Sequence, residues 1–310
     1  GPAQGNARGR QDVPANFRQP ANDPDGLANG PGTQSPIPFV SGSNPDLTPE
    51  SSESMTLGFV YSPSFAPGLN MSLDWWNIRI ENTIITDTVT QVLDDCYLRG
   101  IESRCNAATG SRFERDPATG ELISFITTPI NVGYVETEGF DFDVNYRVST
   151  RLGTFSASWL STYVSGLELK TDNLEDNPPQ QQNGFNGNFR IRSNLNIGWE
   201  RGGWGVSWGM RYYSGVKEQC TEFEDMCSLP HYRAPWTGGE ELPMHERPST
   251  TFHDLQVRYQ APWNATISIG ANNVFEKYGP PMYQQPNSGY SYYGGYDIGR
   301  FVYLKYQQRF

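Results

Sequence analysis

The four cysteines carry the most distinctive chemistry in this sequence, and they form two close pairs, Cys96/Cys105 and Cys220/Cys227. Neither pair is a CxxC motif, and no histidine lies at a ligand spacing from both members of either pair, which argues against zinc. Both pairs lie in polar stretches, so we expect two short disulfides formed in an oxidising compartment. Each would close a loop of about ten residues and stabilise it by roughly 2–3 kcal/mol.

Acidic residues cluster around the second cysteine pair, at Glu218, Glu222, Glu224 and Asp225. Their hard oxygens could hold Ca²⁺, although a solvated loop surface is the simpler reading. The histidines lie in or beside the same stretch, at His231, His245 and His253. No Ser/His/Asp order, Gly-rich phosphate loop or paired-carboxylate arrangement accompanies them. The sequence therefore predicts a protein that is not an enzyme and has no cofactor and no metal site beyond that candidate loop Ca²⁺.

Aromatic side chains are better candidates for binding a ligand, and most of them lie near the end of the chain. The candidates are Tyr232, Trp236, Tyr278, Tyr283, Tyr290, Tyr292, Tyr293 and Tyr296. Flat aromatic faces with polar edges stack on sugar rings or on the aryl groups of siderophores. The same side chains could instead pack the loops against one another.

The segments that must position these residues alternate apolar and polar side chains with a period of two, which predicts strands with one apolar face. The last thirteen residues, Ile298–Phe310, follow this pattern and end on an aromatic residue, as the closing strand of an outer-membrane barrel does. We expect nine strands, at about residues 53–61, 69–80, 140–147, 154–167, 188–199, 204–212, 254–259, 266–271 and 298–310.

The connections between these strands alternate between short turns and long loops. The long loops fall at about residues 83–130, 170–187, 215–248 and 275–297, and residues 1–52 read as a further long loop. Outer-membrane barrels have this asymmetry, with short periplasmic turns and long extracellular loops. The sequence therefore predicts an all-β, antiparallel transmembrane barrel segment over residues 53–310, with both cysteine pairs outside the cell.

The polar positions of the strands carry charges of both signs, which we expect to face the interior of the barrel. They are Asp141, Asp143, Arg147, Arg190, Arg192, Arg211, Asp254, Arg258 and Lys305. Opposite charges on neighbouring strands could neutralise one another across a lumen. Aromatic residues crowd the strand ends, as an interfacial girdle requires. A soluble β-sandwich with an aromatic core is the alternative.

Composition excludes several classes of protein. The net charge of −11, from 23 basic and 34 acidic residues, argues against a nucleic-acid partner. No run of about eighteen apolar residues is present, so we expect no transmembrane helix, whereas a barrel strand needs only about 9–11 half-polar residues. The opening GPAQGNARGRQDVPANFRQP lacks the apolar core of a signal peptide, so we expect a mature chain or a fragment.

Four segments resemble the TonB-dependent outer-membrane receptors. The family's NPxLxPExS segment is similar to SNPDLTPESSESMTLGFVYSP at 43–63, and its acidic strand containing a glycine is similar to GYVETEGFDFDVNYR at 133–147. Its N-L-F-D-x-x-Y-x-x-P segment resembles NNVFEKYGPPMY at 272–283, and its final strand resembles GRFVYLKYQQRF at 299–310. Together these segments span residues 43–310.

The resemblance implies a barrel of about twenty-two strands filled by an N-terminal plug. Nine strands are an odd number and do not close such a barrel, so we expect the chain to be its C-terminal part, without the plug. The remaining N-terminal strands and the plug would lie on another chain or in a segment outside this sequence. The expected partners are outer-membrane lipid, TonB through the plug, and a surface lipoprotein.

The sequence therefore predicts that the chain is part of a Gram-negative outer-membrane transporter. It would import a bulky nutrient, such as an oligosaccharide, a peptide or an iron–siderophore complex, by energy-coupled gated uptake. A secreted all-β adhesion or carbohydrate-binding module is the main alternative, and it would be stable in plain buffer. An outer-membrane protease or lipase would need a polar catalytic cluster at the rim, and the sequence offers none.

Overall fold

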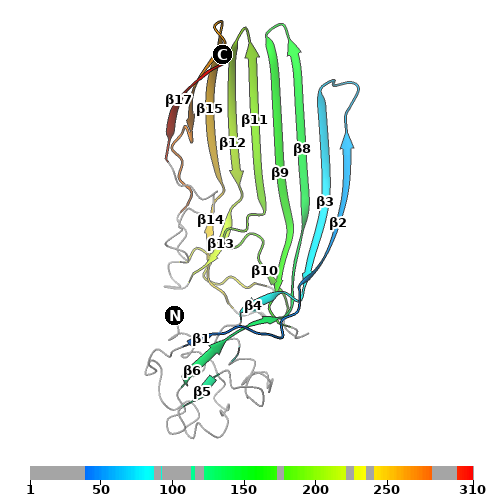
Figure 1. The fold of residues 1–310 in the computed structure, drawn as a ribbon, viewed down its shortest axis with the longest axis vertical. Coiled ribbons are helices and arrows are strands. Elements are labelled where there is room, and N and C mark those ends of the chain that lie inside the picture. Colours follow the sequence, from blue (N-terminus) through cyan, green and yellow to red (C-terminus); the bar gives the residue numbers. More distant parts are fainter. Residues whose placement is uncertain are drawn as a thin grey trace. The chain divides into compact units, whose positions relative to one another are not determined.

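The computed structural model describes residues 39–86, 92, 113–115, 122–172, 178–220, 227–234, 241–280 and 299–309 (Figure 1). They belong to two compact units, one made of residues up to 51 with 81–133, and the other made of 52–80 with 134–310. Within the described ranges, no helix is long and apolar enough to cross a membrane.

The larger unit is built on one sheet whose strands lie side by side in chain order (Figure 1). They are β2 (Ser51–Tyr61), β3 (Leu69–Glu81), β8 (Tyr134–Thr150), β9 (Gly153–Lys170), β11 (Ile191–Arg201), β12 (Trp204–Tyr213), β15 (Thr250–Ala261), β16 (Ala265–Asn272) and β17 (Phe301–Gln308). Every pair from β8 to β17 is antiparallel. Each predicted strand segment overlaps one of these strands. Several, such as β8 and β15, are longer than predicted, whereas β11 begins three residues later than predicted.

Tight turns gather at one end of this sheet and long connections at the other (Figure 1). The turn between β11 and β12 is Gly202–Gly203, with φ of 56° and 86°. Two central residues with positive φ suit a type I′ hairpin, whose twist matches the twist of the flanking strands. Nothing lies within 4 Å of a Cβ added at Gly202, so the backbone conformation rather than space favours glycine there. The alternation of short and long connections agrees with the prediction.

The long connections contain short strands that the sequence analysis missed. Between β12 and β15, β13 (Val216–Gln219) and β14 (Met244–Arg247) form an antiparallel hairpin, and β10 (Gln180–Gln181) pairs with β9. In the smaller unit, β4 (Ile84–Thr86) pairs with β7 (Pro129–Asn131). There β6 (Leu122–Thr127) also lies between β1 (Phe39–Ser41) and β5 (Phe113–Arg115). Strands of two to six residues are too short for a period-two pattern to stand out.

One face of the main sheet is apolar and exposed. Leu304 of β17 is 73% exposed, Val302 is 63% exposed, and Ile269 on the adjoining β16 is 55% exposed. The strand register places Leu304 opposite Ile269, and Ile269 in turn opposite Val257 of β15. Within the described residues, this face is therefore not covered by a second layer, as the face of a soluble sandwich would be.

Candidate functional site

The opposite face of the main sheet is polar from β8 to β17. The register aligns one row of side chains across these strands: Arg147, Ser156, Gly198, Ser207, Gln256, Gly270 and Tyr303. The next row is Ser149, Thr154, Glu200, Gly205, Arg258, Ser268 and Lys305. Because side chains alternate between the two faces of a strand, residues aligned in these rows share one face. We call this surface the polar wall.

Opposite charges meet across the polar wall. A carboxylate oxygen of Glu200 on β11 lies 3.7 Å from a guanidinium nitrogen of Arg147, and Glu200 also pairs with Arg258 of β15. Arg211 Nε lies 3.4 Å from a carboxylate oxygen of Asp254 on the neighbouring strand. Each of these side chains is partly exposed, so each pair contributes about 1 kcal/mol or less to stability. Their main effect is to neutralise charge along the wall.

Eight of the nine charged residues predicted for the polar face share the polar wall by register: Asp141, Asp143, Arg147, Arg192, Arg211, Asp254, Arg258 and Lys305. The ninth, Arg190, lies one residue before β11. Glu200 was missed, because a charged residue beside a turn reads as part of the turn. That the wall lines a lumen remains a proposal.

Small residues leave a hollow in the polar wall on β8, β9, β11 and β12. A hollow of about 370 Å³ is lined in part by Asn145, Ser156, Ser158, Asn196, Gly198 and Ser207. Long side chains elsewhere on the wall lie over glycines of the adjacent strand. A Cβ added to Gly205 would come 2.5 Å from Arg258 Nε, and one added to Gly270 would come 2.5 Å from the Tyr303 hydroxyl oxygen. At these two positions a long side chain therefore lies against the neighbouring strand.

Aromatic rings join β13 to the long-connection end of the sheet. The buried members of this cluster are Phe189, Val216 and Phe252, and Tyr213 packs against them. The Tyr213 ring centroid lies 5.1 Å from that of Phe189 and 6.1 Å from that of Phe252. The guanidinium carbons of Arg192 and Arg211 lie 5.2 and 5.3 Å from the ring centroids of Phe189 and Phe252. These cation–π contacts connect charged residues of the polar wall to the end of the sheet that carries the long connections, which we call the loop end.

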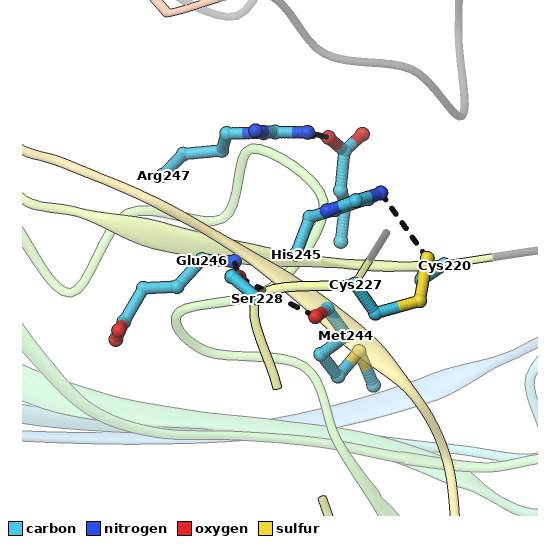
Figure 2. The surroundings of a disulfide bond; sticks show 8 residues. Cys220, Cys227, Ser228, Met244, His245, Glu246 and Arg247 are labelled. Atoms are coloured by element: carbon cyan, nitrogen blue, oxygen red, sulfur yellow. Dashed lines mark hydrogen bonds and ion pairs between the residues drawn. A yellow bond between two sulfur atoms is a disulfide. The ribbon is translucent and has the colours of Figure 1, made fainter. Parts of the chain in front are cut away.

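The predicted Cys220–Cys227 disulfide is present in the structure, at the tip of the β13–β14 hairpin (Figure 2). His245 of β14 points at it, with Nε2 3.1 Å from Cys220 Sγ. A disulfide sulfur carries no hydrogen, so Nε2–H is the donor in this contact. The sequence analysis found no histidine at a ligand spacing from both cysteines of this pair, and the hairpin brings His245 to Cys220 from 25 residues away. Cys96 and Cys105 lie outside the described residues.

A buried ion pair lies beside the disulfide. Glu218 of β13 is 1% exposed, and Arg247 Nε donates to its carboxylate at 2.7 Å. Glu218 therefore does not belong to a solvated acidic surface, which was the simpler reading of the acidic run. The run's other members, Glu222, Glu224 and Asp225, fall outside the described residues.

Only two of the aromatic candidates lie in the part of the chain that the structure describes. The Tyr232 ring centroid lies 6.3 Å from that of Phe185 and 6.0 Å from Lys217 Nζ, and Tyr278 is 48% exposed. The others, Trp236, Tyr283, Tyr290, Tyr292, Tyr293 and Tyr296, lie outside it. A ligand-binding role for all of them stays a prediction.

A small charged cluster lies next to Tyr232. His231 Nδ1 and Arg233 both lie 3.0 Å from the carboxylate of Glu241. The hydrogen bond from His231, followed by that from Arg233, lowers the pKa of Glu241 below its usual 4.5. The cluster therefore favours the charged form of Glu241.

The fold and the two faces together define a class of protein. A meander with one polar face, one exposed apolar face and tight turns at a single end is the wall of a transmembrane β-barrel. The family model described as TonB dependent receptor-like, beta-barrel, matches residues 15–274. The chain belongs to this family, whose members work with TonB and sit in the Gram-negative outer membrane.

Solved structures share this fold at low identity. The siderophore receptor PirA from Acinetobacter baumannii has 16% identity and a TM-score of 0.53, over 86% of this chain and 32% of that chain. The FrpB iron transporter from Neisseria meningitidis (12%, TM-score 0.49) covers the same shares, 86% and 32%. A mutant of the ferric enterobactin receptor PfeA from Pseudomonas aeruginosa (14%, TM-score 0.48) covers 83% and 31%. No curated protein sequence matches. The chain spans about a third of these solved relatives.

Proposed function

We propose that this chain forms the C-terminal part of the barrel of an energy-coupled outer-membrane transporter. Its polar wall would line the interior, and its apolar face would contact lipid. One observation carries this proposal: polar rows run without interruption from β8 to β17, directly behind exposed side chains such as Leu304. Leaving a large apolar side chain in water costs about 1.5–3 kcal/mol relative to burial, and lipid removes that cost.

Partners follow from this arrangement. The outer strands of the described sheet, β2 and β17, need pairing in lipid, where unsatisfied backbone groups cost several kcal/mol each. The remaining barrel strands and a plug domain would supply that pairing and the contact with TonB. The long connections would face the outside of the cell, as in other outer-membrane barrels. They could also receive a surface lipoprotein.

The cargo would be a bulky, scarce nutrient, such as an oligosaccharide, a peptide or a ferric siderophore. Charge pairs such as Arg211–Asp254 leave the wall polar with little net charge, which suits a large ligand with many hydrogen-bonding groups. PirA and PfeA are described as siderophore and ferric enterobactin receptors, which makes ferric enterobactin one probe to test. Passage would be gated by the plug and driven by energy from the inner membrane.

Spin labels on the complete receptor in outer-membrane vesicles test the orientation of the wall. Labels at Val302 and Leu304 should collide mainly with oxygen dissolved in lipid. Labels at Tyr303 and Lys305, which alternate with them, should collide mainly with a water-soluble nickel chelate. Equal access of the nickel chelate to all four positions would refute the barrel-wall assignment.

Uptake by cells tests transport separately. The probes are radioactively labelled ferric enterobactin, maltoheptaose and a hexapeptide. We expect accumulation of at least one probe, which an uncoupler or loss of TonB abolishes. Ser207→Trp on the polar wall should slow it, whereas Val206→Trp on the other face should not. Uptake that survives the uncoupler, or no uptake of any probe, contradicts the proposal.

A further inference from the structure

Two thiol-derived ligands and an imidazole meet at the tip of the β13–β14 hairpin. The sulfur atoms of Cys220 and Cys227 and a ring nitrogen of His245 all lie within 4.8 Å of one another. Cys220 directly follows β13, Cys227 lies in the connection to β14, and His245 is on β14. Figure 2 shows the His245 ring directed at the sulfurs. Two sulfurs and one imidazole nitrogen are a donor set that binds thiophilic divalent ions such as Zn²⁺.

Hydrogen bonds hold these residues together in addition to the disulfide. The Cys220 backbone N–H donates to Pro243 O at 2.9 Å. Leu229 and Met244 exchange two backbone hydrogen bonds, at 2.9 and 3.0 Å. The Glu246 N–H donates to Ser228 Oγ at 2.6 Å. These bonds hold the backbone on both sides of the cysteines against β14, so the three ligand residues would stay adjacent after the S–S bond opens.

We propose that this cluster, once its disulfide is reduced, is a binding site for a thiophilic divalent cation such as Zn²⁺. The reductant is a low-molecular-weight thiol: two RSH molecules supply two electrons and two protons, the Cys220–Cys227 bond breaks and one RSSR forms. Binding of the ion then displaces two protons, one from each thiol, and uses the Nε2 lone pair of neutral His245, whose ring proton moves through water from Nε2 to Nδ1. The fourth position of a tetrahedral ion stays open to water or a carboxylate.

This site is independent of the transport function. In the oxidised chain, the disulfide ties the segment after β13 to the hairpin. In the reduced chain, the bound ion would link the same segment to the hairpin. The order of that segment would then depend on metal under reducing conditions. Arg247 already holds Glu218 beside the site, so the open position does not draw on that carboxylate.

Co²⁺ titration of the complete receptor tests the proposal, in a Cys96→Ser/Cys105→Ser background that leaves one cysteine pair. After reduction with a phosphine and removal of the reductant, we expect one equivalent of Co²⁺ to bind with a thiolate-to-cobalt absorption band and to be displaced by Zn²⁺. The oxidised protein should show no band. His245→Gln should weaken binding at least tenfold, whereas His231→Gln, which alters another loop histidine, should leave it unchanged.

Two results would overturn the site. One is the absence of a thiolate band in the reduced parent. The other is equal Co²⁺ affinity of the parent and His245→Gln, which would show that the dithiol alone binds the ion. Hydrogen exchange of β13 and β14 in oxidised His245→Gln serves as the folding control, and we expect protection equal to that of the parent.

Discussion

Replacing Glu218 by Gln tests how much the buried ion pair stabilises the β13–β14 hairpin. Glu218 is 1% exposed and the Arg247 side chain 13%, so the substitution leaves a guanidinium charge in a largely dry site. Breaking a buried pair in this way costs about 3 kcal/mol. Because about 1.4 kcal/mol corresponds to a factor of ten, amide hydrogens of β13 and β14 should exchange roughly 150-fold faster when exchange follows local opening.

The same hairpin supplies a matched control. Glu246 lies 3.6 Å from Lys217, directly opposite it in the register, but its side chain is 58% exposed. Glu246→Gln should therefore cost less than about 1 kcal/mol and change exchange by less than about fivefold. The double variant Glu218→Leu/Arg247→Met should recover most of the protection, since it removes both charges. An exchange rate for Glu218→Gln within fivefold of the wild type would refute the reasoning.

Three further predictions concern the strands and the loop end. Gly139→Ala places a Cβ 2.4 Å from the Tyr163 carbonyl oxygen, so unfolding by urea in vesicles should become about 1–3 kcal/mol easier; an unchanged midpoint would contradict the close approach. In the same assay, Leu304→Arg should lower the free energy of unfolding by about 2–4 kcal/mol, because it puts a charge into lipid. Lys305→Gln on the polar wall should change that free energy little. Equal changes for the two variants would count against the assignment of faces. Because the pKa of Glu241 is lowered, its contribution to loop stability is present above pH 4.5 and is lost as the pH falls through the folded-state pKa. NMR titration of the carboxyl should show a midpoint below 4.5 that rises in His231→Gln. A midpoint unaffected by that change would show that His231 is not the cause.

The strands and their faces could be predicted from the sequence because they depend on local periodicity. Phe140 to Arg147 alternate so regularly that β8 and its polar face follow from that stretch alone. The strand register then keeps the polar and apolar faces aligned across the sheet. A shift of one residue in the register would turn every side chain of that strand to the wrong face.

The loop end could not be predicted, because its contacts join residues far apart in the chain. Glu218 reads as a surface acid, and only its partner Arg247, 29 residues away, explains its burial. The sequence suggests that His245 lies in a loop, whereas the structure places it on β14, which pairs with β13. Each of these strands has only four residues. Short strands and single long-range contacts leave no periodic pattern, so composition favoured exposed loops where the structure has a packed hairpin.

The side chains that lie over glycines of the polar wall shape the surface that a ligand would meet there. Where Arg258 and Tyr303 lie over Gly205 and Gly270, donors and acceptors sit close to the backbone surface. Neighbouring strands are about 4.8 Å apart, a spacing shorter than a sugar ring and its substituents. If the wall lines the transport path, as we propose, a large ligand would contact two strands at once. It would then move by exchanging weak, closely spaced contacts, each of which breaks quickly.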